Sequence, residues 1–172
     1  MRILLLSLFL FGSLSTQAFA AKTASKIITG DEADRMLSNV ISMLASGDKE
    51  TLKDFFEDDA TKDLKINIIG GTGENGEPLT LSARNLKYKD KFAPIFNGGM
   101  PFGGETFVAR DNRSAAGHFQ LLSFNQNSGE NKMTNIQSNC SFSMILDNDY
   151  MLRLSKLECR VSEKTINLSG SQ

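Results

Sequence analysis

The sequence predicts a single α+β domain in which helices precede an antiparallel sheet. Three observations lead to this prediction. Apolar residues recur at helical spacing between residues 29 and 56, and from residue 64 onward they alternate with polar residues. Short polar turns separate the alternating segments. Helices grouped before strands are typical of an α+β architecture, whereas a regular alternation of the two would indicate a parallel sheet.

The first predicted helix begins at a capping box. Thr29 is the expected N-cap and Glu32 follows three residues later, so each side chain can bind the other residue's backbone N–H. The apolar face of this helix consists of Ala33, Met36, Leu37, Val40, Ile41 and Leu44. Gly47 ends the helix, and Asp48 is expected to cap a shorter second helix. The buried side of the second helix consists of Leu52, Phe55 and Phe56.

A strand pair is expected next. Residues 64–68 place Leu64, Ile66 and Ile68 on one face. The dipeptide at residues 75–76 is Asn-Gly, which favours a hairpin turn. The return strand at residues 79–81 is short and is predicted to lie at a sheet edge, because the preceding proline cannot donate a ladder hydrogen bond.

A third helix and a strand meander complete the predicted order. The helix is expected over residues 83–96, with a kink at Pro94. Residues 97–104, rich in glycine, are predicted to form a loop. The strands expected after this loop are residues 105–110, 117–126, 132–146 and 151–162, with polar turns at 111–113 and 147–149.

The N-terminal segment has the pattern of a secretory signal. Arg2 is followed by an apolar run from Ile3 to Leu14 and by the small-x-small pattern of residues 18–20. The run is too short to span a membrane. We therefore expect residues 1–20 to be cleaved, leaving a secreted or periplasmic protein without a stable membrane anchor. Residues 21–28 are a flexible lead-in, 29–165 the domain and 166–172 a frayed tail.

Charge argues against nucleic acid as a partner. The chain has 19 basic and 20 acidic residues, and loss of Arg2 with the signal leaves 18 basic residues in the mature chain. A protein that binds nucleic acid normally carries a basic excess to neutralise phosphates. Phenylalanine is abundant and tryptophan is absent, so the aromatic side chains serve cores and apolar surfaces.

Cys140 and Cys159 are predicted to form a disulfide, because export places this lone pair of cysteines in an oxidising compartment. Strand register is consistent with the bond if one bulge lies near residues 155–156. Leu146 then faces Leu152, Met144 faces Leu154, Phe142 faces Leu157 and Cys140 faces Cys159. The closed loop corresponds to about 3 kcal/mol of stabilisation in the chain-entropy model.

The element order, with the break at residues 45–48 and Leu52, Phe55 and Phe56 behind it, resembles the NTF2-like superfamily, also called SnoaL-like or cystatin-like. The resemblance covers residues 29–162. It implies a cone in which N-terminal helices pack on a curved antiparallel sheet. It also implies relatives that include isomerases, dehydratases, carriers of small ligands and assembly modules, so it does not choose a function.

One residue is a candidate for catalysis. Histidine is the side chain best suited to act as a general base near neutral pH, and His118 is the single histidine of the chain. A carboxylate partner would come from the acidic group Asp54, Asp58, Asp59 and Asp63. The competing interpretation is a surface histidine and a solvated helix end, which the sequence favours because no local motif arranges these residues.

A ligand pocket is predicted from apolar residues near the mouth of the cone. Its expected lining is Phe55, Phe92, Phe96, Met100 and Phe102. No metal site or cofactor is predicted. Residues 71–76 match G-x-G-x-x-G, but Glu77-Pro78 follows instead of a helix, which favours a hairpin turn. One histidine and two cysteines do not complete a common structural zinc site.

The sequence thus favours an exported, non-catalytic module that binds a small apolar ligand or a partner protein through its concave sheet. The alternative is an enzyme similar to ketosteroid isomerases or dehydratases that uses His118 and a pocket aspartate. A third hypothesis is an assembly module that forms a homodimer through its sheet face. A packed cone interior would favour the interaction hypotheses, and an inward His118 beside an acid would favour the enzyme.

Overall fold

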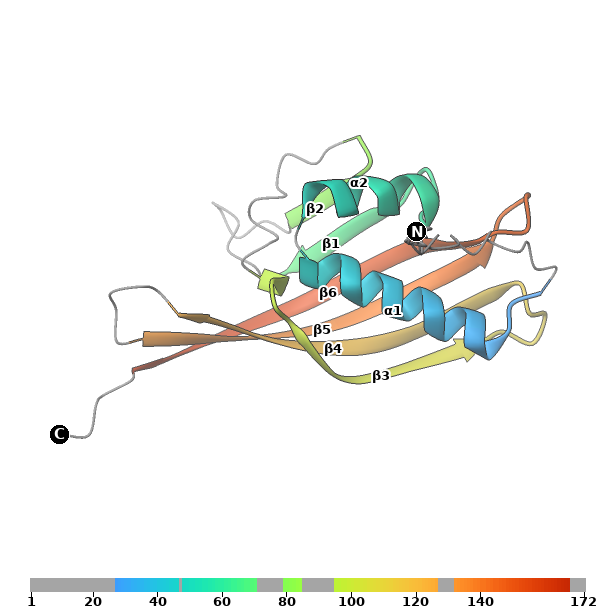
Figure 1. Cartoon of the computed structure of the whole chain (residues 1–172). Helices are drawn as coiled ribbons and strands as arrows, with labels where there is room; N and C mark the ends of the chain where they lie inside the picture. Colours follow the sequence, from blue (N-terminus) through green and yellow to red (C-terminus); the bar gives the residue numbers. More distant parts are fainter. Residues whose placement is uncertain (1–26, 47, 71–78, 85–94, 127–131, 168–172) are drawn as a thin grey trace, which may run out of the picture.

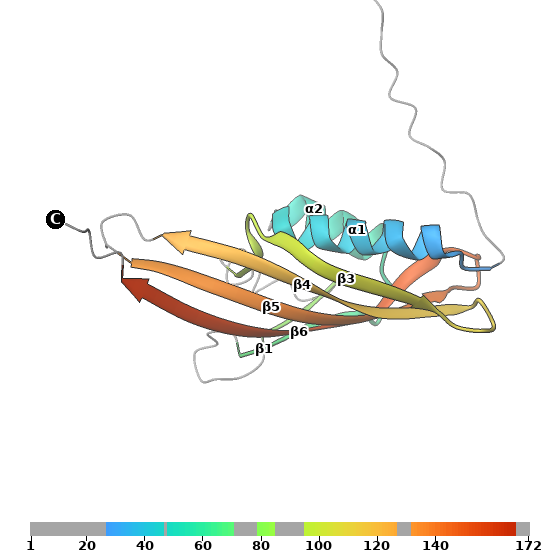
Figure 2. The ribbon, with the colours of Figure 1, turned by 90° about the horizontal axis from the view of Figure 1, so that it is seen from below.

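The computed structural model describes residues 27–46, 48–70, 79–84, 95–126 and 132–167. In this part of the chain, two helices lie against one face of a six-stranded sheet (Figures 1 and 2). The helices are α1 (Gly30–Ser46) and α2 (Lys49–Asp58). The strands are β1 (Lys65–Ile69), β2 (Leu79–Ser82), β3 (Met100–Val108), β4 (Ser114–Gln126), β5 (Lys132–Leu146) and β6 (Leu152–Asn167). The predicted α+β class is confirmed.

The sheet has the order β2-β1-β6-β5-β4-β3 and is mixed. Strand β1 runs parallel to β6, while the other neighbours are antiparallel. This parallel pair was not expected from the sequence. The sheet curves around the helices without closing, so the face they cover is concave (Figure 2). Strand β2 lies at one edge, as predicted, and β3 at the other.

Both predicted helix caps are confirmed. The Thr29 backbone N–H donates to Glu32 Oε2 at 2.9 Å, and the Glu32 N–H donates to Thr29 Oγ1 at 3.3 Å. Asp48 Oδ2 accepts from the Thr51 backbone N–H at 2.9 Å. The buried residues of α1 are Ala33, Met36, Leu37, Val40, Met43 and Leu44. Ile41, expected on this face, is partly buried against the same core, and Met43 is an addition.

Alternation along the strands separates an inner face, toward the helices, from an outer face. Phe119, Leu121, Phe142 and Met144 are fully buried on the inner face. The neighbouring strand β3 contacts α1 directly, because the Thr106 hydroxyl donates to Asp34 Oδ1. The concave face is therefore filled over its middle by side chains of the sheet and the helices.

The predicted loop at residues 97–104 is wrong from Met100 onward, because β3 begins there. Gly103 and Gly104 pair with β4, and the register shifts between Pro101 and Gly103. A Cβ on Gly104 would lie 3.3 Å from Phe119 Cβ and 3.5 Å from Leu37 Cδ2. Glycine thus lets β3 pass close to the core and α1. In the sequence alone, glycines with this role look the same as the glycines of a loop.

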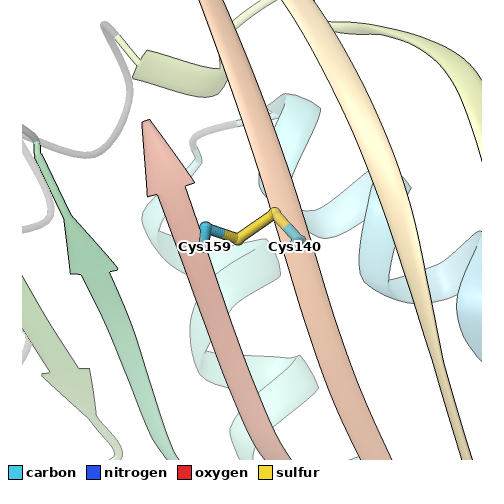
Figure 3. Close-up of a disulfide and its surroundings, with 2 residues drawn as sticks. All are labelled: Cys140 and Cys159. Atoms are coloured by element: carbon cyan, nitrogen blue, oxygen red, sulfur yellow. A yellow bond between two sulfur atoms is a disulfide. The ribbon is translucent and has the colours of Figure 1, made fainter. Parts of the chain in front are cut away.

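The β5–β6 hairpin has the predicted register. Cys140 faces Cys159, Phe142 faces Leu157, Met144 faces Leu154 and Leu146 faces Leu152, and Ser155 is the extra residue of β6. The Cys140–Cys159 disulfide joins β5 to β6 (Figure 3), with the two Cα atoms 4.0 Å apart. Both cysteines are buried on the inner face. The bond therefore fixes the centre of the sheet.

The turn between β5 and β6 is held by Asp147. Its Oδ1 accepts from the Asp149 and Met151 backbone N–H groups, both at 2.9 Å, and its Oδ2 lies 2.9 Å from Arg153 Nε. Burial alone raises the pKa of Asp147, but the hydrogen bonds from Arg153 and the two backbone groups outweigh it and hold that pKa below its ordinary value. Arg153 Nη1 also donates to the Asp58 carbonyl, which joins the turn to the end of α2.

Several predicted segments lie outside the described residues or differ from them at their ends. The signal at 1–20 and residues 85–94 of the predicted third helix lie outside. Residues 83–84, its expected start, form a turn, whereas Ile95 and Phe96 are helical and buried. Ile28, assigned to the lead-in, is buried, and its N–H donates to the Asn112 carbonyl at 2.7 Å. Strand β6 continues through Asn167, beyond the expected start of the tail.

Candidate functional site

On the outer face of the sheet, the outward positions of β4 and β5 form a stretch with little charge. The outward residues of β4 are the even-numbered positions from Ser114 to Gln126, and those of β5 are the odd-numbered positions from Met133 to Ile145. None of these fourteen positions holds Asp, Glu, Lys or Arg. Most surface strands carry charged residues on their solvated side. This stretch, which is bordered by charged outward residues of β6 such as Arg160, therefore resembles the core of an interface more than an ordinary solvated surface.

Large apolar side chains are exposed on the same face. The most exposed are Met100 at 56%, Phe107 at 59%, Phe124 at 43%, Ile145 at 38% and Ile166 at 41%. Met100 lies opposite Leu122, and Ile166 lies opposite Met133, so each of these two has an apolar neighbour across strands. Exposed apolar residues gathered on one face mark sites of interaction. We refer to the five residues as the outer apolar set.

The far ends of β4, β5 and β6 extend beyond the helices as an arm (Figure 1). Polarity is inverted along this arm. Thr134 and Thr165 occupy its inner face, where their hydroxyls are 3.3 Å apart. Phe124, Met133 and Ile166 occupy its outer face. The side that would be buried against another chain is thus the outer one.

His118 lies on the outer face and is exposed, directly opposite Glu105 on β3 and Ser141 on β5. Asp54, Asp58, Asp59 and Asp63 belong to α2 and the residues after it, which lie beside β6. His118 is on β4, with β5 between it and β6, so it is two strands away from the carboxylates expected to assist it. Catalysis by His118 stays a prediction without support from this geometry.

The predicted pocket residues do not share one lining. Phe55 and Phe96 are buried in the core, whereas Met100 and Phe102 are 56% and 52% exposed. Met100 belongs to the outer face, opposite Leu122. Phe92 lies outside the described residues. The sequence could not separate these residues, because their positions depend on where β3 begins and on the register shift within it.

Two polar residues of the inner face were missed by sequence reasoning. Ser123 and Ser138 are each 1% exposed, and within the described ranges neither hydroxyl has a hydrogen-bond partner. Period-two alternation places Ser123 with Leu121 and Ser138 with Cys140 on the buried side. That alternation is the signal that would have located them.

The residues that the structure describes hold no group of three or more His, Cys, Asp or Glu arranged to bind a metal ion. Among the helices in these ranges, none combines the length and the apolar character needed to cross a membrane.

Comparison with solved structures identifies the fold. A hexachlorocyclohexane dehydrochlorinase, LinA-type3 from Novosphingobium barchaimii LL02, aligns with a TM-score of 0.55 and 14% identity over 83% of this chain and 92% of its own. A putative ketosteroid isomerase from Shewanella frigidimarina NCIMB 400 aligns with a TM-score of 0.53 and 10% identity over 74% and 93%. Another from Parabacteroides distasonis ATCC 8503 aligns with a TM-score of 0.52 and 16% identity over 83% and 93%.

The chain has the NTF2-like fold. No family model matches the sequence, and no curated protein matches it either. Identities of 10–16% to solved structures establish the fold alone. Because NTF2-like folds serve both binding and catalysis, the function of this chain has to be argued from its own surfaces.

Proposed function

We propose that this protein is an exported, non-catalytic assembly module that binds a protein through the outer face of its sheet. The observation that carries the proposal is the outer apolar set, exposed on the same face as the uncharged outward positions of β4 and β5. Cores of protein interfaces are depleted in charged residues and enriched in aromatic residues and methionine. The proposed surface differs from the concave face expected from the sequence, which the helices cover over its middle.

The partner best matched to this surface is a second copy of the chain. An isologous dimer brings the same face together from both subunits, so any charge near its centre meets a like charge. The outward positions of β4 and β5 avoid that repulsion because they are uncharged. Their amide and hydroxyl groups, such as Gln137 and Asn139, can donate and accept across the symmetry axis.

Two further features support an exported and non-catalytic protein. The N-terminal signal pattern and the Cys140–Cys159 disulfide both support an oxidising compartment. His118 lies on the outer face opposite Glu105 and not beside the acidic group at α2, so the pairing of His118 with a pocket aspartate lacks support.

Sedimentation of the mature chain tests the proposal. We expect the unmodified protein to dimerise with rising concentration, and Ile145→Glu and Phe124→Glu each to shift it to monomer, because each places a charge within the apposed faces. Asn39→Glu adds the same charge on the exposed side of α1 and should leave the dimer intact.

Circular dichroism and thermal unfolding confirm that each variant is folded before its mass is interpreted. A protein that stays monomeric at every concentration would contradict a second copy as the partner. A dimer that Asn39→Glu disrupts and Ile145→Glu does not would contradict the choice of the outer face.

A further inference from the structure

A row of basic residues follows β6 on the outer face of the sheet. Lys156, Arg160 and Lys164 are exposed there, each four residues from the next. Lys65 of β1 lies beside Lys156 on the same face, because the next pair along these two strands is Ile66 with Leu157. We refer to the four basic residues as the basic stripe. At about 3.3 Å per residue, its part on β6 is about 26 Å long.

The positive charge of the basic stripe is poorly neutralised by the protein itself. Among the described residues, Lys65, Lys156 and Lys164 have no ion pair. Arg160 Nε lies 4.0 Å from Glu158 Oε1, and the Arg160 side chain is 76% exposed. A pair this exposed, at the limit of ion-pair distance, contributes little. The stripe therefore keeps most of its charge available to a partner.

Two members of the stripe repel each other. Lys65 and Lys156 are neighbours on adjacent strands, and like charges in such positions destabilise a sheet. Neither lysine has a carboxylate partner in the described structure that would offset this cost. An anion between the two ammonium groups would replace the repulsion by attraction on both sides. The pair thus favours a bound anion.

The acidic residues of the chain are concentrated elsewhere. Residues 30–63, which contain both helices, hold ten acidic and four basic residues. The helices lie on the inner face of the sheet, whereas the stripe is on the outer face (Figure 2). The nearly equal numbers of basic and acidic residues in the whole chain therefore conceal a local positive surface. Such a surface attracts anions even when the net charge of the protein is close to zero.

The shape of the basic stripe favours a linear partner. The stripe follows one strand, with a single residue added on the neighbouring strand. The outer face is convex (Figure 2), so a flat lipid surface would meet only part of the stripe. An extended polymer can instead lie along the strand and contact every basic residue.

The chemistry of the stripe and its neighbours suits an anionic polysaccharide. Lysine and arginine donate to carboxylate or sulfate oxygens. Ser162 lies between Arg160 and Lys164, and its hydroxyl is exposed to the hydroxyl groups of a sugar. Asn135 lies opposite Lys164 and adds an amide. Single-stranded nucleic acid normally stacks its bases on aromatic side chains, and no outward residue of β6 is aromatic.

We propose that the basic stripe binds an extended anionic polysaccharide along β6. Lys156, Arg160 and Lys164 contact anionic groups spaced along the polymer, and Lys65 adds a second cation beside Lys156. No covalent step is involved. The stripe borders the uncharged positions of β4 and β5 without including them, so the proposal goes beyond self-association and does not require it.

Dextran sulfate and dextran form a matched pair of probes, because they share one neutral backbone and only the first carries anionic groups. Binding of the fluorescein-labelled polymers to mature protein is measured by fluorescence anisotropy at increasing salt concentration. Lys156→Gln, Arg160→Gln and Lys164→Gln remove the charges of the stripe one at a time. Lys53→Gln removes the same charge from the exposed side of α2 and is the matched control.

We expect dextran sulfate to bind and dextran not to bind. Each glutamine variant of the stripe weakens dextran sulfate about two- to fivefold, the range of one exposed ion pair, and releases about one counterion fewer. Glu158→Gln removes the acidic residue between Lys156 and Arg160 and tightens binding. Without polymer, Lys156→Gln unfolds at the same or a higher temperature, because the repulsion from Lys65 is lost.

Equal binding of dextran and dextran sulfate, or binding of neither, would overturn the proposal. So would dextran sulfate binding that survives unchanged in the triple variant Lys156→Gln/Arg160→Gln/Lys164→Gln, or that Lys53→Gln weakens as much as Lys156→Gln does. Tighter binding of single-stranded DNA or of phosphatidylglycerol vesicles than of dextran sulfate would contradict a polysaccharide as the partner. Sedimentation of the triple variant without polymer shows separately whether self-association persists, so failure of the stripe is distinguishable from failure of the proposed dimer.

Discussion

Gly117 occupies a position in the β3–β4 ladder where no side chain fits. A Cβ there would lie 2.0 Å from the Glu105 carbonyl oxygen and 2.7 Å from Phe142 Cζ. Because one obstacle is backbone and the other is a buried ring, neither can move without loosening the sheet. The same strand pair carries Phe107, so Gly117 also positions part of the outer apolar set.

Gly117→Ala should lower the free energy of unfolding by about 1–3 kcal/mol, the usual penalty for overpacking a core. Urea unfolding followed by circular dichroism measures it. Gly30→Ala is the matched control, because a Cβ on Gly30 would meet nothing within 4 Å. Equal stability of the two variants would show that β3 is not held as closely to β4 as described.

A second residue-scale effect depends on pH. The lowered pKa of Asp147 means that its ionised form is favoured by folding. The contribution of ionised Asp147 to the free energy of unfolding is complete above the ordinary carboxyl pKa of 3.8. It is lost as the pH falls through the lower folded-state pKa.

Asp147→Asn should therefore destabilise the protein near neutral pH by about 1–3 kcal/mol, because Arg153 loses a charged partner. The difference between variant and parent should shrink at acid pH, where Asp147 is protonated in both states of the parent. Guanidinium unfolding across the acid range measures this, with Asp149→Asn in the same turn as control. A difference that does not change with pH would contradict the role of the ionised carboxylate.

Among the elements, the β5–β6 hairpin was the most predictable from sequence and the β3 strand the least. The hairpin is local, so alternation, one bulge and the cysteine pair were enough to give its register. Strand β3 begins inside a glycine-rich segment whose strand character comes from pairing with β4 and from contact with α1. The parallel β1–β6 pair joins segments distant in sequence, and no local pattern reports such a choice.

For the candidate site too, local features were predictable from the sequence and features set by strand pairing were not. His118 and the phenylalanines were identifiable as residue types, but their faces depended on register. Ser123 and Ser138 stand out only once burial and missing hydrogen bonds are known. The resemblance to the NTF2-like superfamily suggested that a face of the sheet could bind another chain. Choosing the outer face required the positions of the helices.

Removing the disulfide is the element-scale prediction. Cys140→Ala/Cys159→Ala should lower the free energy of unfolding by about 3 kcal/mol, because the unfolded chain regains the freedom of the closed loop. Thermal unfolding with and without reductant measures it. The unmodified protein should respond to reductant and the double variant should not, because the chain has two cysteines in all. An unmodified protein indifferent to complete reduction would contradict a stabilising role.

For the whole molecule, the fold divides two kinds of surface between the two sides of one sheet. The concave side is covered by α1 and α2 and contains the buried serines, while the convex side exposes the outer apolar set. The NTF2-like fold supports both binding and catalysis, so the surfaces of this chain carry the argument.

Isotope-filtered NMR on a mixture of ¹³C-methyl-labelled and unlabelled mature protein tests the central claim most directly, because it reports only contacts between copies. We expect intermolecular contacts from the methyl groups of Met100, Met133, Ile145 and Ile166. The methyl groups of Met36 and Met43, buried against the inner face, should show none. Contacts confined to the helical side, or none at concentrations where sedimentation finds a dimer, would contradict the outer face as the surface of association.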